Sequence, residues 1–231
     1  MLEYLQSHQL LDGDALLTQL GIKHSQLDSS RYFLSVDQLV DFITPILDKA
    51  NIQDLIYYLI SEQRLSQHDL VGLLSLCSVN IRQEISMLIR FYKLRSRLVN
   101  MEFIEQDNQA IIRISANYDL GVANTFVIEM ALMSLYTGKQ HVLNTQNTTD
   151  VIDIAHPPTT EEHFLGAQVR FNQPYNQLVF PASELDAKLQ STHKATVDLL
   201  HDQAQQLLGE HEHDDITNKV RQLLKSSSDK F

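Results

Sequence analysis

The sequence lacks a second cysteine, a long hydrophobic run and an excess of basic charge. Cys77 is the only cysteine among 231 residues, which excludes an intrachain disulfide framework and favours a reducing compartment. No apolar run approaches the roughly 18 residues needed to span a bilayer. The first residues, MLEYLQSHQLLDGD, do not contain the basic stretch that begins a secretion signal. These absences predict a cytoplasmic protein with no membrane segment.

Acidic residues outnumber basic ones by 29 to 18, which gives a formal net charge of -11. The electric field of such a chain repels the phosphates of nucleic acids. We therefore expect that this chain alone does not bind DNA, and that any DNA contact requires a separate basic domain.

Signatures of enzymes and metal sites are weak. The sequence contains no glycine-rich phosphate loop, dinucleotide fingerprint or HExxH motif. Ser191 and Lys194 match S-x-x-K but have no companion motif. His211 and Asp215 would share a helix face, yet a solvated linker explains them as well as a metal site does, because a closed site needs further ligands. We predict a non-enzyme with no catalytic residue, no metal and no cofactor.

Hydrophobic periodicity predicts an α+β fold with a helical N-terminal half, residues 1–97. One helix begins at Ser35, and Gln38 stands three residues later at the spacing of a capping box. Pro45 lies inside this helix, so a kink or break is expected there. A second helix, from Ser78 onward, carries Arg90 among other basic residues.

The second half predicts a small mixed sheet with covering helices, followed by helical linkers. LVNMEFIEQ and AIIRISA alternate and form a hairpin, and a helix over 120–137 ends near Gly138. VIDIAH is a further strand. AQVRF and QLVFP read as a second hairpin joined through NQPYN, and a helix follows over 184–208.

Several segments resemble the effector-sensing, "arabinose-binding" domain of AraC-type transcription regulators. They are LLTQLGIKHSQLDSSRYFLSVDQLVDFI, HDLVGLLSLCSVNIRQEISMLIRFYKLRSRLVN and, most specifically, HFLGAQVRFNQPYNQLVFPASEL. The resemblance implies a regulatory, effector-binding and dimerisation domain over 1–182. It also implies a linker over 183–231, where VRQLL looks like the first helix of a DNA-binding domain that is otherwise missing. A stand-alone small-molecule-binding or protein-interaction module is the alternative.

The effector is expected in the α+β part, in a pocket within residues 98–181 closed on one side by the helix that carries Arg90. Arginine suits the recognition of a carboxylate, although solvated or structural roles explain single arginines as well. The candidate effector-binding residues are Arg90, Arg113, Tyr118 and Arg170.

A homodimer is expected through an apolar seam on the C-terminal helix. Its members recur at spacings of three and four residues: Val197, Leu200, Ala204 and Leu207. Packing of this seam onto its own domain is the alternative. In this interpretation the partners are a small-molecule effector, a second copy of the chain and, only through the missing domain, DNA.

Overall fold

The computed structural model describes residues 1–27, 34–62, 69–94, 96–144, 149–158, 167–189 and 196–209. The chain divides into two compact units, each made of two separate stretches. The sheet unit consists of Met1–Arg64 and Leu98–Glu184, and the helical unit of Leu65–Arg97 and Leu185–Phe231. The expected boundary near residue 182 lies close to this change of unit, whereas the expected helical half, residues 1–97, is shared between the units. The division into domains 1–182 and 183–231 stays a prediction.

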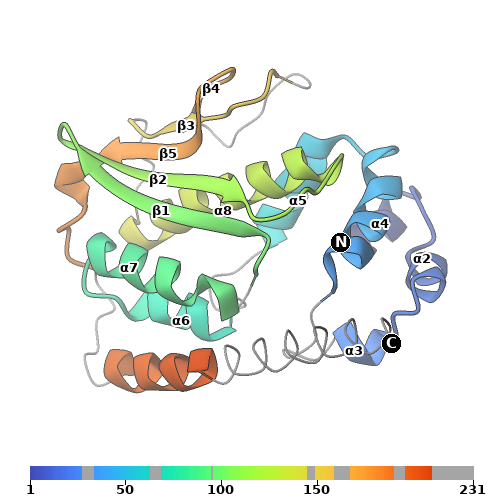
Figure 1. The fold of residues 1–231 in the computed structure, drawn as a ribbon, viewed down its shortest axis with the longest axis horizontal. Coiled ribbons are helices and arrows are strands. Elements are labelled where there is room, and N and C mark those ends of the chain that lie inside the picture. The colour runs from blue at the N-terminus through green and yellow to red at the C-terminus, as the bar shows by residue number, and fades with distance from the viewer. Residues whose placement is uncertain are drawn as a thin grey trace, which may run out of the picture. The chain divides into compact units, whose positions relative to one another are not determined.

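The sheet unit begins with short helices (Figure 1). They are α1 (Leu2–Ser7), α2 (Gly13–Gln19), α3 (His24–Leu27), α4 (Val36–Leu47) and α5 (Ile52–Glu62). The capping box of α4 is confirmed, because the Ser35 hydroxyl accepts from the Gln38 amide and the Gln38 side chain accepts from the Ser35 amide. The break expected at Pro45 does not occur. Proline removes one hydrogen-bond donor, and only two helical residues follow it.

A five-stranded sheet follows, with strand order β1-β2-β5-β3-β4. Its strands are β1 (Val99–Gln106), β2 (Gln109–Ala116), β3 (Val151–Asp153), β4 (Gln168–Arg170) and β5 (Asn176–Pro181). The first predicted hairpin is confirmed: β1 and β2 pair antiparallel. Its turn residues Asp107 and Asn108 both have positive φ, as a tight two-residue hairpin turn requires.

The second predicted hairpin is wrong. β3 lies between β4 and β5, parallel to the first and antiparallel to the second. Ile154, just after β3, also bonds to the segment that follows β4: its amide donates to the Arg170 carbonyl, and its carbonyl accepts from the Gln173 amide. Alternation of side chains shows that a segment is a strand but not which strand is its neighbour.

Helix α8 (Ala123–Leu143) packs against β2 and β5 and covers one face of the sheet (Figure 1). It is longer than the helix expected over 120–137, since it runs through Gly138 to Leu143, where the C-cap residue Asn144 has left-handed φ. The side chains that point toward α8 are buried; they include Ala110, Ile112, Ile114, Ile152, Leu178 and Phe180. The combination of helices with a mixed sheet confirms the α+β class.

The helical unit contains α6 (Asp69–Cys77), α7 (Ile81–Phe91) and a helix over 196–209. These three helices share one apolar cluster, whose buried members are Val71, Leu74, Phe91, Ala204 and Leu208. The helix expected over 184–208 begins later than predicted. Residues 182–184 form a 3-10 turn and Lys188 makes a β-bridge with Asn80. The predicted segments 190–195 and 210–231 lie outside the described residues, as does the possible metal pair at 211–215.

Within the part of the chain that the structure describes, no helix is both long and apolar enough to cross a membrane.

Candidate functional site

A row of five polar side chains runs across the sheet, one from each strand. Paired positions place them side by side in the order Glu102, Arg113, Gln177, Asp153 and Arg170. Successive side chains of a strand point to opposite faces. Because the adjacent residues Ile112, Ile152 and Leu178 are buried on the α8 side, this polar row lies on the outer face of the sheet.

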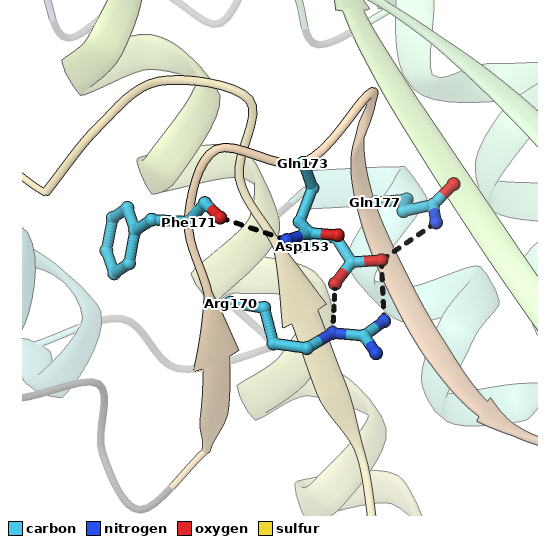
Figure 2. A network of polar contacts seen from close by, with 5 residues as sticks. All are labelled: Asp153, Arg170, Phe171, Gln173 and Gln177. Carbon is cyan, nitrogen blue, oxygen red and sulfur yellow. Dashed lines mark hydrogen bonds and ion pairs between the residues drawn. The ribbon is translucent and has the colours of Figure 1, made fainter.

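At one end of the polar row, Arg170 on β4 forms a bidentate ion pair with Asp153 on β3 (Figure 2). The Arg170 Nε atom lies 2.7 Å from Asp153 Oδ1, and its Nη2 atom lies 3.0 Å from Oδ2. Gln177 on β5 donates a further hydrogen bond of 2.9 Å to Oδ2. The Asp153 side chain is 3% exposed and that of Arg170 is 51% exposed. The hydrogen bond to Asp153 raises the pKa of Arg170, so this guanidinium stays charged.

Arg113 on β2 forms the other half of the polar row. Its Nε and Nη2 atoms each donate to Gln177 Oε1 at 3.3 Å, and its Nη1 atom lies 3.9 Å from Glu102 Oε2. The guanidinium carbon lies 3.6 Å from the centre of the Tyr175 ring, a cation–π contact. Gln177 thus accepts from Arg113 and donates to Asp153, which makes the polar row continuous from β1 to β4.

Two loops beside the polar row are joined by backbone hydrogen bonds, and we call them the paired loops, residues 154–158 and 171–175. The Asn172 amide donates to the His156 carbonyl at 3.2 Å, and the Ala155 amide donates to the Asn176 side chain at 2.8 Å. The Gln173 side chain donates to the Phe171 carbonyl (Figure 2). These bonds hold the segment that follows Arg170 and contains Tyr175.

Of the four predicted effector-binding residues, the structure brings two into one network. Arg113 and Arg170 both belong to the polar row. Tyr118 follows β2 and is 46% exposed, and no contact between described residues joins it to that row. Arg90 lies on α7 in the helical unit, where its Nη2 atom donates to Gln205 at 2.5 Å. The effector-binding role of these four residues stays a prediction.

Sequence reasoning missed Asp153, Tyr175 and Gln177. A usable signal was present, because Asp153 and Gln177 are polar residues within otherwise apolar strand segments, VID and NQLVF. Their meeting with Arg113 depends on strand order, which the predicted hairpin had wrong.

The predicted dimer seam packs within its own chain. Val197 and Ala204 are buried, and Leu200 lies against the apolar cluster of the helical unit. Leu207 is half-buried. By contrast, Leu199 is 69% exposed. Intrachain packing, the alternative left open for this seam, is what the structure contains, and dimerisation stays a prediction.

A hollow of about 680 Å³ lies near the N-terminus of the sheet unit. It is open to solvent and its lining includes Leu2, Leu5, Leu10, Leu11, Asp12, Asp14 and Lys49. The effector pocket was expected elsewhere, within residues 98–181. This hollow is therefore a second candidate site for ligand binding.

Comparison with known proteins shows which family this chain is similar to. The family described as the arabinose-binding domain of AraC transcription regulator, N-term, matches residues 11–189. The chain is 25% identical over 173 residues to the ornithine utilization regulator of Pseudomonas aeruginosa, a match that covers 72% of this chain and 51% of that protein. The chain thus spans about half the length of that relative.

A solved structure, that of the transcriptional regulator CdpR from Pseudomonas aeruginosa, is similar with a TM-score of 0.55 and 13% identity. The match covers 80% of this chain and 58% of that chain. At this identity the likeness concerns the fold alone.

Proposed function

Because this chain belongs to the family of N-terminal arabinose-binding domains of AraC transcription regulators, we propose that its polar row binds the regulator's effector. Membership makes the chain a regulatory, effector-binding domain. The observation that carries the choice of site is the half-exposed Arg170 guanidinium, which the nearly buried Asp153 holds in place. Residues oriented by their neighbours lose less freedom when a ligand binds.

Arg170 offers a carboxylate an edge that no described residue occupies. A guanidinium carries five N–H donors, and Asp153 engages its Nε and Nη2 atoms. The third nitrogen points away from Asp153 (Figure 2). A ligand carboxylate can therefore accept from Arg170 without displacing Asp153, and such charge-assisted bonds are the stronger ones.

The charges of the polar row favour a ligand that carries both signs. Two arginines stand against two carboxylates, so their formal charges cancel and a simple anion gains little from net charge. The name of the ornithine utilization regulator refers to an amino acid with one carboxylate and two ammonium groups. An amino acid is accordingly the ligand class proposed for this chain.

The test is a thermal-shift and calorimetric titration of the chain with ornithine, other amino acids, putrescine and 5-aminopentanoate. Putrescine is ornithine without its carboxylate, and 5-aminopentanoate is ornithine without its α-ammonium group. A ligand of the native state raises the melting temperature by mass action. At least one amino acid should do so, and the analogue without a carboxylate should not.

Matched variants locate the site. Arg170→Gln should abolish the shift, whereas Lys49→Gln, in the hollow near the N-terminus, should retain it. Loss of the shift in Lys49→Gln alone would place the ligand in that hollow. A shift with sugars or fatty acids and none with amino acids would refute the proposed ligand class.

In the whole regulator, we propose that a separate domain binds DNA and that two copies of the chain pair. The support is the family, the acidic charge of this chain and the need of such regulators to reach two DNA half-sites. In a mobility-shift assay near physiological salt, the 231-residue chain should not retain the upstream DNA of its gene, while the full-length regulator should. Specific retention of this DNA by the chain alone would contradict the proposal that a separate domain binds DNA.

Since the seam is packed inward, the proposed dimer contact is the exposed side of helix 196–209, around Leu199. Leu199→Asp should convert a dimer into a folded monomer in sedimentation velocity. Leu200→Asp should instead lower the free energy of unfolding by about 2 kcal/mol or more, because a charge enters the apolar cluster. A chain that stays monomeric at high micromolar concentration would exclude a dimer formed by this chain alone.

A further inference from the structure

A carboxylate is buried in the middle of α8. The Glu129 side chain is 0% exposed, and its Oε2 atom accepts a 2.7 Å hydrogen bond from Gln53 Nε2 on α5. Its Oε1 atom lies 3.1 Å from His156 Nε2, an electrostatic contact without the alignment of a hydrogen bond. A buried carboxylate is costly unless it is paired or neutralised, so a proton shared between Glu129 and His156 would stabilise this arrangement.

The other nitrogen of His156 fixes the chemistry of the pair. His156 Nδ1 lies 2.8 Å from the carbonyl oxygen of Pro157. A carbonyl only accepts hydrogen bonds, so Nδ1 carries a hydrogen. In a neutral ring Nε2 would then be a lone pair facing a carboxylate oxygen, which is unfavourable in a buried site. One additional proton removes the conflict, whether it resides on the ring or on Glu129.

His156 is also part of the structure that supports the polar row. Its carbonyl accepts from the Asn172 amide, and its ring lies 5.9 Å from that of Phe171. Both contacts lead into the loop that runs from Arg170 to Tyr175. The Glu129–His156 contact therefore connects α8, and through Gln53 also α5, to the paired loops.

We propose that His156 and Glu129 form a proton-dependent latch, which holds the paired loops against α8 only while the pair carries its proton. The latch itself is independent of the proposed function; its effect on effector binding rests on that function. Releasing the latch would loosen the loop between Arg170 and Tyr175 and weaken the effector site.

The direction of the pH effect follows from the neighbours of the ring. Among the described residues in contact with His156, Glu129 is the ionisable one, and Phe171 carries no charge; Gln53, which binds the other Glu129 oxygen, is also uncharged. The latch is closed at acidic pH, where the pair carries its proton, and opens as the pH rises and the proton is lost. The ring is 21% exposed, so protons can exchange with solvent.

The absence of tryptophan from the sequence makes a clean reporter possible. Tyr175→Trp places a single tryptophan in the second paired loop, at a position that is 50% exposed. Its emission maximum should shift in one transition as the pH rises, while circular dichroism stays unchanged.

Two variants in the reporter background test the latch. Glu129→Gln keeps the shape and can donate to a neutral His156 ring, so the latch should stay closed and the transition should be lost. His156→Phe should leave the latch open, with the high-pH emission at every pH. His201→Gln, in the helical unit, is the control and should retain the transition.

An unchanged transition in Glu129→Gln, or no transition in the reporter chain, would overturn the latch. Effector binding is measured separately, in the chain with Tyr175 intact, at pH 5.5 and 8.5. A transition without any amino-acid binding would leave the latch standing and refute the proposed ligand. Equal amino-acid affinity at both pH values, with no transition in the reporter chain, would refute the latch and leave the proposed ligand standing.

Discussion

The two faces of the sheet differ in which ionic side chains are buried, as two aspartates in and just before strand β3 show. Asp150, just before β3, points toward α8 and is bound by Lys139, whose Nζ atom lies 2.7 Å from Asp150 Oδ2 and 2.5 Å from Glu184 Oε2. All three side chains are at most 18% exposed. Three residues later, Asp153 points to the outer face and is bound by the half-exposed Arg170.

The difference separates a structural ion cluster from a site that can meet a ligand. Beneath α8 the cation is enclosed by its two carboxylates and lies 4.5 Å from the Phe180 ring, so no donor edge faces solvent. On the outer face only the aspartate is enclosed, and its arginine partner remains accessible. Burial of the anion with exposure of the cation is the arrangement that orients a guanidinium for binding.

The largest effect is expected from Lys139→Met, which leaves Asp150 and Glu184 without their cation. Breaking a buried pair by removing one partner costs about 3 to 5 kcal/mol. Arg170→Met, the matched change on the outer face, should cost less, about 1 to 3 kcal/mol, because Gln177 still donates to Asp153. Urea denaturation at neutral pH, followed by circular dichroism, measures both.

A control for the first prediction combines Lys139→Met with Asp150→Asn, which removes one uncompensated charge and should recover part of the stability. Equal losses for Lys139→Met and Arg170→Met would show that the two faces do not differ as described.

Adjacent positions on β5 give the second comparison. Leu178 is 0% exposed on the α8 face, and Leu178→Ala should lower the free energy of unfolding by about 2 to 4 kcal/mol, since it removes buried methyl groups and leaves a cavity. Gln177→Ala removes polar contacts from the outer face and should cost about 1 kcal/mol. If Gln177→Ala proved the more damaging change, the polar row would be a main support of the fold rather than a binding surface.

Local patterns in the sequence predicted most single elements. Alternation identified β1 and β2, and the spacing of Ser35 and Gln38 identified the start of α4, because each depends on residues a few positions apart. Gly138 misled the prediction of the end of α8. A glycine in a helix costs only about 1 kcal/mol relative to alanine, which packing of the flanking turns can offset.

The partners of each element were harder to predict. β3 separates β4 from β5, and the helix over 196–209 packs against the consecutive helices α6 and α7 from a distant stretch of the chain. Arg113 and Arg170 were named as candidates from the sequence. Their partners, Gln177 for Arg113 and Asp153 for Arg170, follow from strand order alone. Burial of Ala204 likewise depends on the apolar cluster that it shares with α6 and α7, which an isolated heptad pattern does not reveal.

The third prediction concerns the pH dependence of the inner cluster. Burial raises the pKa of Asp150, and the hydrogen bond from Lys139 opposes this effect. A folded-state pKa above the unfolded value means that the folded protein binds the proton more tightly. The contribution of Asp150 to stability therefore declines as pH rises from the ordinary aspartate value through its raised folded value.

Urea denaturation of the chain and of Asp150→Asn across this acidic window measures the effect, which should be smaller than that of either substitution above. The stability of the chain relative to Asp150→Asn should fall as pH rises. Asp186 is the control, because its hydrogen bond from Arg82 lowers its pKa, so its stabilising contribution is lost as pH falls. If stability relative to Asp150→Asn and relative to Asp186→Asn changed with pH in the same direction, the assigned role of burial would be contradicted.

The smallest effect on stability is expected from Arg113→Lys on the outer face. Lysine keeps the charge beside Glu102 and Tyr175 but has no planar fork to donate from two nitrogens to Gln177. Since Arg113 is partly exposed, the free energy of unfolding should change by no more than about 0.5 kcal/mol. The amino-acid-induced rise in melting temperature should nevertheless shrink, because Gln177 is no longer fixed between Arg113 and Asp153. Lys188→Arg, an exposed change of the same kind in the helical unit, should alter neither quantity. A large loss of stability with unchanged ligand binding would assign Arg113 to the fold and leave Arg170 as the functional arginine of the polar row.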